Sequence, residues 1–556
     1  MATETIATEK MATEKMDGRV RIAIAGAGVS GFATLGYLVN SLRDLPLGAV
    51  TLYWLQPPRK ICTDNLSASQ RDRLTQLKNR GLDPSQLLGG GLVYHPVQPS
   101  LFTFNGNSAA RGFNFVAERY DTNDYFEWVQ SNRDWLVALY PDFAPEKGQQ
   151  RHPEHTLDDI QGTTPRGAFG LYLHAQVLAL KAHLPEHITL QIVPEALQSV
   201  EQAEQTVTLK TGTRQLSVDY LVEATGPRFS KLRPEWDGRV FRAYPCDRIA
   251  LPATDRSNHN SLSHNLPPQV TVVGAGASGI EVALHLLHNL GVGQVTLVSR
   301  RAQSRLPQVE PTEAYECQWF TRENMRRQPT AKNAQALLQK ELEACYEACY
   351  LAYPGWDELL NIKDYPSFLE DYLKATEETT GRATEKTTNL SPNHPLAHLV
   401  RPVMSFYGQV KDLLPEVEQI ALLQLINRVK PLFATQSRPC AELMLAALKT
   451  NRLRLIAGEF LPALTTPTIV QPDGTQLHPD CVILATGFDP SIPPFYPQAG
   501  HPQSSRTCRY QVMGTSLSAV HKQAANAAKE IASDVSKKLA DRAFLGCRLY
   551  EKAKPT

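Results

Sequence analysis

The chain has 556 residues, 42% of them hydrophobic, with 57 basic and 56 acidic side chains. The length corresponds to about three or four domain-sized units, and a net charge of +1 gives no basic field that would attract nucleic acid or an anionic membrane surface. Since no run of about 18 apolar residues is present, we expect no membrane span. Residues 1–18 are polar, with an A-T-E-K repeat, and we expect a disordered tail rather than a secretory signal.

The first glycine fingerprint follows a strand-like apolar run at residues 20–25. It has the form G-x-G-x-x-G and precedes helix-like sequence, which is the arrangement of a βα turn that binds a dinucleotide. Glycines there permit the tight turn, the approach of backbone to pyrophosphate, and close packing of helix on strand. We predict an FAD site that includes Gly26, Gly28, Ser30 and Gly31.

Two later segments extend this predicted FAD site. The strand-like run 49–55 ends at Gln56, where many such sites place a carboxylate that accepts a hydrogen bond from the adenine ribose. The amide oxygen of Gln56 can take that role without charge. A strand at 219–226 ends in Ala-Thr-Gly, whose small residues let backbone approach a ligand, so Thr225 and Gly226 join the site.

The fingerprint recurs at residues 274–279, after the apolar run 270–273. A polar stretch rich in Pro, Ser and His at 253–267 precedes it and indicates a linker. A later strand, at 481–489, again ends in Ala-Thr-Gly. We therefore predict a second nucleotide site that includes Gly274, Gly276, Ser278 and Gly279. Thr486 and Gly487, at the end of the later strand, are also expected to bind a cofactor.

The strand that follows the second fingerprint ends in Ser299, Arg300 and Arg301. Two guanidinium groups and a hydroxyl at this point can hold a 2′-phosphate through charge-assisted hydrogen bonds. We therefore predict NADPH rather than NADH at the second site. The alternative is that both arginines are solvated loop charges.

The other reactive residues give little evidence of a further site. None of the nine cysteines forms a C-x-x-C pair, which argues against a dithiol reductase and fits free thiols in the cytoplasm. Cys345 and Cys349 share a helix face and are read as packing residues. The histidines lack ligand spacing, so we expect no metal. Two alternatives stay open for each of two further residues. His95 could lie near the flavin or be structural, and Arg166 could contact a pyrophosphate or pair with a neighbour near the start of a helix.

These elements predict an α/β fold with two doubly wound, Rossmann-like dinucleotide-binding domains and a mainly helical insertion. Residues 61–165 are expected to be irregular, with an aromatic cluster at 113–128 that is more typical of core than of a substrate cage. An exposed loop is expected at 374–393 and an amphipathic helix at 516–539. The predicted domains are a disordered tail at 1–18, an FAD-binding domain at 19–245 and 475–556, an NADPH-binding domain at 253–312 and 453–474, and a helical cap over the active-site cleft at 313–452.

Two G-x-G-x-S-G fingerprints, the basic pair and the terminal Ala-Thr-Gly-Phe resemble the class B flavoprotein monooxygenases. More closely, residues 120–129, 165–173 and 400–439 resemble a family of bacterial FAD/NAD(P)-binding oxidoreductases. That family is related to the lysine and ornithine N-hydroxylases. The chain departs from Baeyer–Villiger enzymes, because F-x-G-x-x-x-H-x-x-x-[WY] is missing between the fingerprints.

The resemblance implies an oxygenation cycle that uses FAD and NADPH, in which a flavin peroxide passes one oxygen atom to a small-molecule amine or other nucleophile. The flavin carries the chemistry in such a cycle, so no catalytic side chain is named. Two alternatives stay open: an NADPH-dependent reductase with an acceptor other than oxygen, and a non-catalytic flavin-binding sensor. The sequence gives no oligomeric state.

Overall fold

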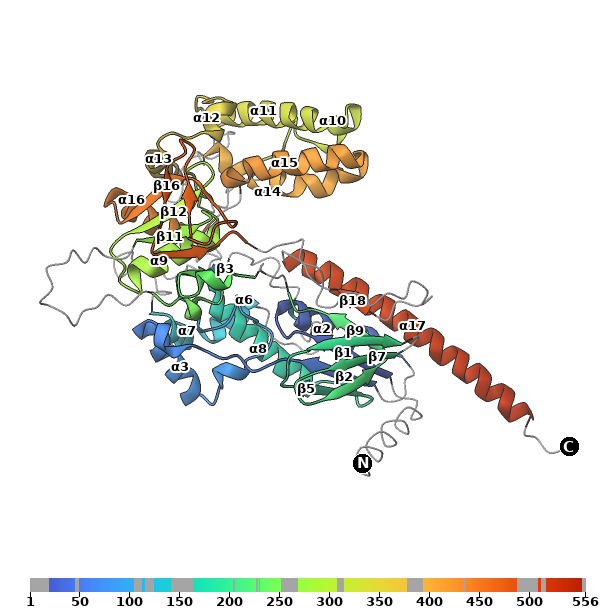
Figure 1. Ribbon diagram of the computed structural model, residues 1–556. Helices are drawn as coiled ribbons and strands as arrows, with labels where there is room; N and C mark the ends of the chain where they lie inside the picture. Colours follow the sequence, from blue (N-terminus) through green and yellow to red (C-terminus); the bar gives the residue numbers. More distant parts are fainter. Residues whose placement is uncertain are drawn as a thin grey trace, which may run out of the picture.

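Two parallel sheets of five strands each organise the chain (Figure 1). The structure is a computed structural model, and it describes residues 20–45, 50–104, 113–115, 125–141, 164–203, 206–226, 229, 231–251, 269–307, 315–377, 394–433, 436–487, 509–511 and 517–552. The predicted tail at 1–18, the linker at 253–267 and most of the loop at 374–393 lie outside these residues.

The first sheet is built around β1, which carries the first glycine turn at its end. Alternate side chains of β1 point to opposite faces: Ile22 and Ile24 pack under helices, whereas Ala23 and Ala25 pack under a small antiparallel sheet. The strand order is β18 (Arg509–Gln511), β9 (Tyr220–Glu223), β1 (Val20–Ala25), β2 (Val50–Leu55) and β5 (Ile188–Val193). The antiparallel sheet consists of β6 (Ser199–Ala203), β7 (Thr206–Lys210) and β8 (Gln215–Val218).

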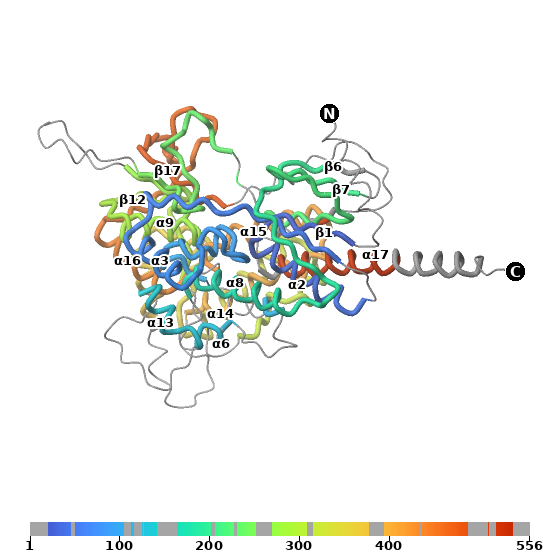
Figure 2. Tube along the Cα trace, turned by 90° about the horizontal axis from the view of Figure 1, so that it is seen from below, coloured from blue at the N-terminus to red at the C-terminus, as the bar shows by residue number. Residues whose placement is uncertain are grey.

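Three long helices cover the other face of this sheet. Figure 2 shows α17 running beside α2, and both helices bury apolar side chains in the same core cluster as α8. These helices are α2 (Val29–Leu42), α8 (Arg166–Ala182) and α17 (Leu517–Lys552). Helix α17 is longer than the predicted 516–539, because good helix formers continue beyond that point.

The second sheet repeats this plan around β11. Its strand order is β10 (Val240–Arg242), β17 (Cys481–Leu484), β11 (Val270–Val273), β12 (Val295–Ser299) and β13 (Leu453–Ala457). Helices α9 (Ala277–His288) and α16 (Arg438–Lys449) pack on one face. The other face packs against β14 (Glu459–Phe460), β15 (Ile469–Val470) and β16 (Gln476–Leu477).

The predicted helical insertion lies between β12 and β13, and its core is continuous with that of the second sheet. In Figure 1, α10, α11, α14 and α15 form an arm that extends from that sheet. The insertion contains α10 (Arg322–Arg327), α11 (Ala331–Ala348), α12 (Trp356–Leu360), α13 (Tyr365–Glu377), α14 (Pro395–Val410), η10 (Lys411–Leu413) and α15 (Glu416–Phe433).

Two expectations need correction. The pattern places β10 and β17 with the FAD-binding domain, but both strands pair in the second sheet, next to each other and to β11. Only β18 and α17 return to the first sheet, so 245 and 475 are not the boundaries. The stretch 61–165 is also less irregular than expected. It holds η2 (Thr63–Asn65), α3 (Ala68–Asn79), η3 (Pro84–Gln86), β3 (Thr103–Phe104), α6 (Tyr125–Ser131), α7 (Arg133–Leu139) and β4 (Thr164–Pro165).

Two short 3-10 helices, η7 (Pro234–Trp236) and η8 (Cys246–Arg248), flank β10 at the crossing into the second sheet. Across the described part of the chain, no helix has both the length and the apolar character that a bilayer span would need.

His285 makes stability depend on pH. Its side chain is buried in α9, where Nδ1 contacts Asn289 Oδ1 at 3.0 Å, and burial lowers its pKa to about 4. The unfolded chain takes up a proton near pH 6.5, so the stability present above that pH is lost as the pH falls toward 4.

We expect His285→Gln to reduce the loss of stability between pH 7 and pH 5 by about 2 kcal/mol, because the unfolded state no longer gains that proton. Urea unfolding at the two pH values measures this loss. His183→Gln, at an exposed position, is the control and should keep the wild-type pH dependence. An unchanged loss in His285→Gln would contradict the assignment.

Candidate nucleotide sites

The first glycine turn connects β1 to α2 through contacts that exclude side chains. Gly26 has φ of +104°, and a Cβ there would lie 2.5 Å from the carbonyl oxygen of Ala224. A Cβ on Gly31 would lie 1.8 Å from the carbonyl oxygen of Gly26. The turn therefore holds the first residues of α2 against the end of the sheet, with helix N–H groups at its opening.

A second glycine segment, Gly89–Gly91, lies against this turn. The backbone N–H of Gly89 donates to the carbonyl of Ala27 at 3.0 Å, and a Cβ on Gly28 would lie 3.5 Å from Gly91 Cα. Gly89 and Gly91 have φ of +83° and +58°. Successive backbone N–H groups in a turn, where right- and left-handed conformations alternate, form anion-binding concavities. The three adjacent glycines are the only feature of the sequence that could have indicated a role of this segment in the site, because the pattern around them indicates only a loop.

Gln56 lies at the end of β2 with its amide oriented by the same region. Its Nε2 donates to the carbonyl of Leu87 at 2.9 Å. The other amide atom, Oε1, is buried and has no hydrogen-bond partner among the residues that the structure describes. Buried acceptors normally have partners, so this oxygen suits a ribose hydroxyl, the role that the sequence predicts for it.

The remaining predicted residues of the first site surround the turn. Ser30 is buried in α2, and its carbonyl accepts a hydrogen bond from Thr34 Oγ1 at 2.8 Å. Thr225 is exposed just beyond β9. Gly226 has φ of +76°, and the position of its Cβ faces open space. The strand end thus leaves room beside the glycine turn.

The second turn repeats this geometry between β11 and α9. Gly274 has φ of +106°, and a Cβ there would lie 2.7 Å from the carbonyl oxygen of Ala485. A Cβ on Gly279 would lie 1.6 Å from the carbonyl oxygen of Gly274. Thr486 and Gly487 are exposed where β17 ends, and Gly487 has φ of +86°. Each turn is therefore closed by an Ala-Thr-Gly strand end.

The predicted phosphate-binding residues of the second site differ in what they offer. The Ser299 hydroxyl donates to the carbonyl of Gln303 and accepts from its N–H, both at 3.0 Å, so it orders the turn after β12. Arg300 is exposed, and Arg301 Nη1 donates to the carbonyl of Arg428 at 3.0 Å. The two guanidinium groups, rather than the hydroxyl, are the groups left to meet a phosphate.

Arg305 is a residue of this site that the sequence pattern does not identify. A Cβ built on Gly276, the N-cap residue of α9, would lie 3.4 Å from Arg305 Nη2. The guanidinium therefore covers the N-terminal end of α9, where a pyrophosphate is expected. Its position in a loop, five residues beyond Arg300, gives no periodic signal that could have indicated this.

A buried ion pair joins the two halves next to the second turn. Arg166, the first residue of α8, donates to Glu281 of α9, with Nη2 2.8 Å from Oε2 and 3.0 Å from Oε1. Thr103 N–H also donates to Glu281 Oε1 at 3.0 Å. Tyr244 accepts from Arg166 and donates to Ser278 Oγ at 3.2 Å. Of the two roles left open for Arg166, the structure shows the structural one, in which it pairs with a neighbouring carboxylate.

The pKa values of this pair follow from burial and charge. Burial is the largest single influence on Arg166 and lowers its pKa, but the charge of Glu281 together with the interactions with Tyr244 and Tyr94 outweighs burial and raises the pKa above its ordinary value. Both side chains are nearly inaccessible, with relative exposures of 13% and 4%. The guanidinium stays charged at all pH values relevant to the protein.

His95 and the cysteine pair take structural positions. His95 Nε2 lies 2.7 Å from the carbonyl of Pro84, Nδ1 accepts from Val97 N–H at 3.1 Å, and burial lowers its pKa to about 3. Cys345 and Cys349 are buried in the core of the insertion. Over the described ranges, no cluster of three or more His, Cys, Asp or Glu side chains could hold a metal ion.

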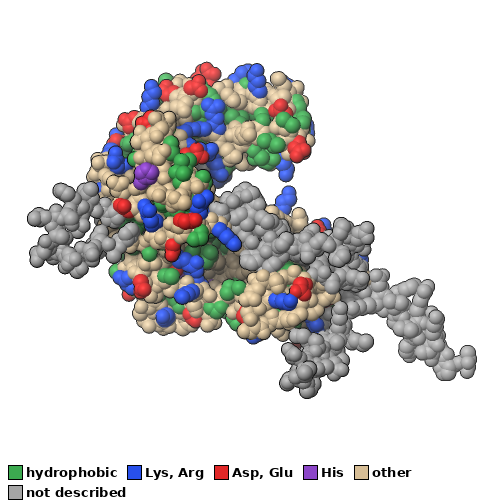
Figure 3. Space-filling view, viewed as in Figure 1, with side chains coloured by type: hydrophobic (Ala, Val, Ile, Leu, Met, Phe, Trp, Pro, Cys, Tyr) green, Lys and Arg blue, Asp and Glu red, His purple; other side chains and the backbone are tan. Residues whose placement is uncertain are grey.

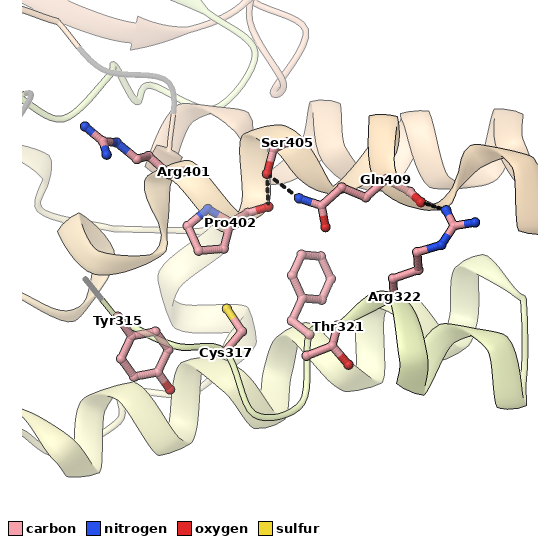
Figure 4. A pocket seen from close by; sticks show the side chains of 9 residues that line it. Tyr315, Cys317, Thr321, Arg322, Arg401, Pro402, Ser405 and Gln409 are labelled. Carbon is pink, nitrogen blue, oxygen red and sulfur yellow. Dashed lines mark hydrogen bonds between the residues drawn. The ribbon is translucent and has the colours of Figure 1, made fainter.

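A cavity of about 380 Å³ lies in the helical arm, away from both turns. In Figure 4, Cys317 and Tyr315 lie below Pro402 of α14, and Arg401 points away from the space between them. Arg322, at one end, pairs with Asp412 through contacts of 2.6 and 2.8 Å. The cavity contains none of the residues predicted to bind a nucleotide.

Two family models match overlapping segments of the chain. Residues 61–228 match the FAD-NAD(P)-binding family, and residues 150–326 match the pyridine nucleotide-disulphide oxidoreductase family. Together with the two Rossmann-like sheets, these matches place the chain in the class of FAD- and NAD(P)-binding oxidoreductases, as the fingerprints predict. No curated protein sequence matches the chain.

Solved structures give a distant likeness over most of the chain. Ornithine hydroxylase from Pseudomonas aeruginosa is 13% identical, with 94% of this chain and 100% of that chain covered and a TM-score of 0.41. Ornithine N-hydroxylase from Kutzneria sp. 744 is 11% identical, with 93% and 99% covered and a TM-score of 0.40. L-lysine 6-monooxygenase from Pseudomonas syringae is 14% identical, with 85% and 82% covered and a TM-score of 0.35. Likeness at this level does not define a shared activity.

We expect Arg166→Met to lower the free energy of unfolding by about 3–5 kcal/mol, because it leaves the Glu281 carboxylate buried without its cation. Adding Glu281→Met should recover much of this loss. Urea unfolding measures both variants. Arg322→Met removes an exposed pair and should cost less than about 1 kcal/mol. If Arg166→Met costs no more than this control, the ion pair does not hold the two halves together.

Proposed function

We propose that this chain is an FAD-dependent, NADPH-using oxidoreductase, with FAD at the first glycine turn and NADPH at the second. The observation that carries the proposal is the repeated geometry of the two turns. In each, a left-handed glycine lies under the carbonyl of an Ala-Thr-Gly strand end, and the last glycine lies on the carbonyl of the first. Two such turns in one chain suit two dinucleotides held at once.

The residues of the first turn fit FAD. Gly89–Gly91 adds backbone N–H groups beside the opening of α2, and the buried Oε1 of Gln56 offers an acceptor at the ribose position. Thr225 and Gly226 leave open space at the end of β9. These groups bind and orient a dinucleotide without a charged side chain at the ribose.

The residues of the second turn fit NADPH. Arg300 and Arg301 follow β12 at the position of the adenine ribose, and Arg305 covers the start of α9. A carboxylate at the ribose position would repel a 2′-phosphate, whereas guanidinium groups bind it in a forked geometry. We therefore assign FAD to the first glycine turn, and NADPH to the second glycine turn with its arginines.

We infer that the reaction is the monooxygenation of a small-molecule amine or other nucleophile, which rests on the sequence resemblance to class B flavoprotein monooxygenases. When bound, the flavin supplies the redox chemistry. The chain's contribution is to position the two nucleotides relative to each other and to keep water out. The Arg166–Glu281 pair serves the first task because it joins α8 to α9. A cytoplasmic location, consistent with the unpaired thiols, is part of the same proposal.

Crossed glycine substitutions test the two-site assignment. We expect Gly31→Ala to abolish FAD retention and to preserve NADP+ binding, and Gly279→Ala to do the reverse, because each added Cβ meets a carbonyl oxygen within 2 Å. Flavin absorbance of the purified protein and calorimetric titration with NADP+ measure the two properties. Gly408→Ala, whose Cβ meets nothing within 4 Å, should change neither.

Two outcomes would contradict this assignment: retention of both nucleotides in Gly31→Ala, or loss of FAD alone in Gly279→Ala. If Gly31→Ala does not fold, Gln56→Leu gives the same test. It removes the ribose acceptor, and we expect it to weaken FAD binding while NADP+ binding stays unchanged.

Turnover distinguishes the reaction classes. We expect NADPH to bleach the bound flavin under anaerobic conditions. Re-admitted oxygen should then yield an N-hydroxylated product from a primary amine, or a sulfoxide from a thioether, in a panel of such compounds. Bleaching with transfer only to a non-oxygen acceptor would identify a reductase. A flavin that stays oxidised with NADPH would identify a binding protein without turnover and would overturn the proposal.

A further inference from the structure

We propose that α15 of the helical insertion forms one wall of the nicotinamide nucleotide site and supplies two cations to its phosphates. Arg428 joins Arg300 and Arg301 at the 2′-phosphate, and Lys430 joins Arg305 at the pyrophosphate. This inference rests on the proposed function and adds residues of the insertion to the second site.

Hydrogen bonds attach this wall to the loop that follows β12. Arg301 Nη1 donates to the backbone carbonyl of Arg428 at 3.0 Å. The carbonyl of Arg305 accepts from Tyr365 OH and from Gln436 Nε2, both at 2.8 Å. Gln436 N–H donates to the carbonyl of Leu306 at 2.9 Å. The insertion therefore fixes the loop that carries Arg300, Arg301 and Arg305 through contacts from α13, from α15 and from the segment after α15.

The cations on this wall lie close enough to affect one another. Burial and the positive charge of Arg305 lower the pKa of Lys430. Burial and the charges of Arg428 and Arg300 lower the pKa of Arg301. Like charges held together by the fold destabilise the empty site, and an anion bound between them relieves that repulsion.

Carboxylates do not neutralise this cluster. No ion pair in the described part of the chain involves Arg300, Arg301, Arg428 or Lys430. Glu281, whose charge acts on Arg305, is committed to its contact with Arg166. Figure 3 shows the surface hollowed between the two halves of the molecule, with Lys and Arg side chains along its border.

The positions and the chemistry of these cations suggest which of them bind the pyrophosphate and which bind the 2′-phosphate. Arg305 lies against the N-terminal end of α9, where the pyrophosphate of a bound dinucleotide is placed, and the charge of Lys430 adds to it as a point charge. Arg428 is grouped with Arg300 and Arg301, because Arg301 contacts its backbone. Guanidinium groups suit the planar, forked recognition of a phosphate monoester. The first pair serves any nicotinamide dinucleotide, whereas the second serves only NADPH and NADP+.

Calorimetric titration of the full-length protein with NADP+ and with NAD+ tests this division without turnover. We expect Lys430→Gln to weaken both nucleotides about fivefold, and Arg428→Gln to weaken NADP+ about fivefold with NAD+ unchanged, the effect of one partly exposed charged contact each. The Arg300→Ala/Arg301→Ala variant should lose more of its NADP+ affinity. Lys411→Gln, at an exposed lysine of η10 in the same insertion, is the control and should bind both nucleotides as the wild type does.

Wild-type affinity in both Lys430→Gln and Arg428→Gln, together with weaker NADP+ binding in the Arg300→Ala/Arg301→Ala variant, would overturn the role of α15 and leave the proposed function standing. Equal losses of NADP+ and NAD+ in Arg428→Gln would overturn its assignment to the 2′-phosphate. A wild-type protein that binds neither nucleotide would overturn the proposed function and this inference together.

Discussion

The contact between Arg166 and Glu281 determines how the two nucleotide-binding halves of the molecule meet. Both side chains are nearly inaccessible, so the pair persists only while the halves stay in register. Arg166 begins α8, and seven residues later Leu173 lies against Gly89, beside the first glycine turn. Seven helical residues span about 10 Å. One rigid helix thus relates the first turn to the start of α9, and the spacing of the two sites is a property of α8 rather than of a flexible connection.

The sequence was sufficient where structure is local. Each glycine turn depends on contacts within a few residues, so the fingerprint predicts the positions and the left-handed conformation of Gly26 and Gly274. The helical insertion was predictable for the same reason, because helix periodicity is a local property. Sheet membership is not local. Strand β17 carries the same Ala-Thr-Gly ending as the strand at Tyr220–Glu223, and nothing in its own residues indicates which central strand it joins.

The side-chain contacts of the sites were only partly predictable. The acceptor role of Gln56 follows from its place after β2, but the hydrogen bond from Nε2 to Leu87 that frees the oxygen joins segments 31 residues apart. Ser299 occupies the predicted position, yet its hydroxyl closes a turn with Gln303. Arg305 and the cations of α15 reach the second turn only through the packing of the insertion, which no spacing in the sequence encodes.

The edge strand β18 has a consequence for synthesis. The second sheet uses strands between Val240 and Leu484, whereas the first needs Arg509–Gln511 beside Tyr220–Glu223. During translation the first sheet therefore stays one strand short until residues 509–511 have left the ribosome. All five strands of the second sheet have been synthesised before β18. The usual order, in which the N-terminal unit matures first, is thus reversed, and the half that we assign to the flavin is the last to be completed.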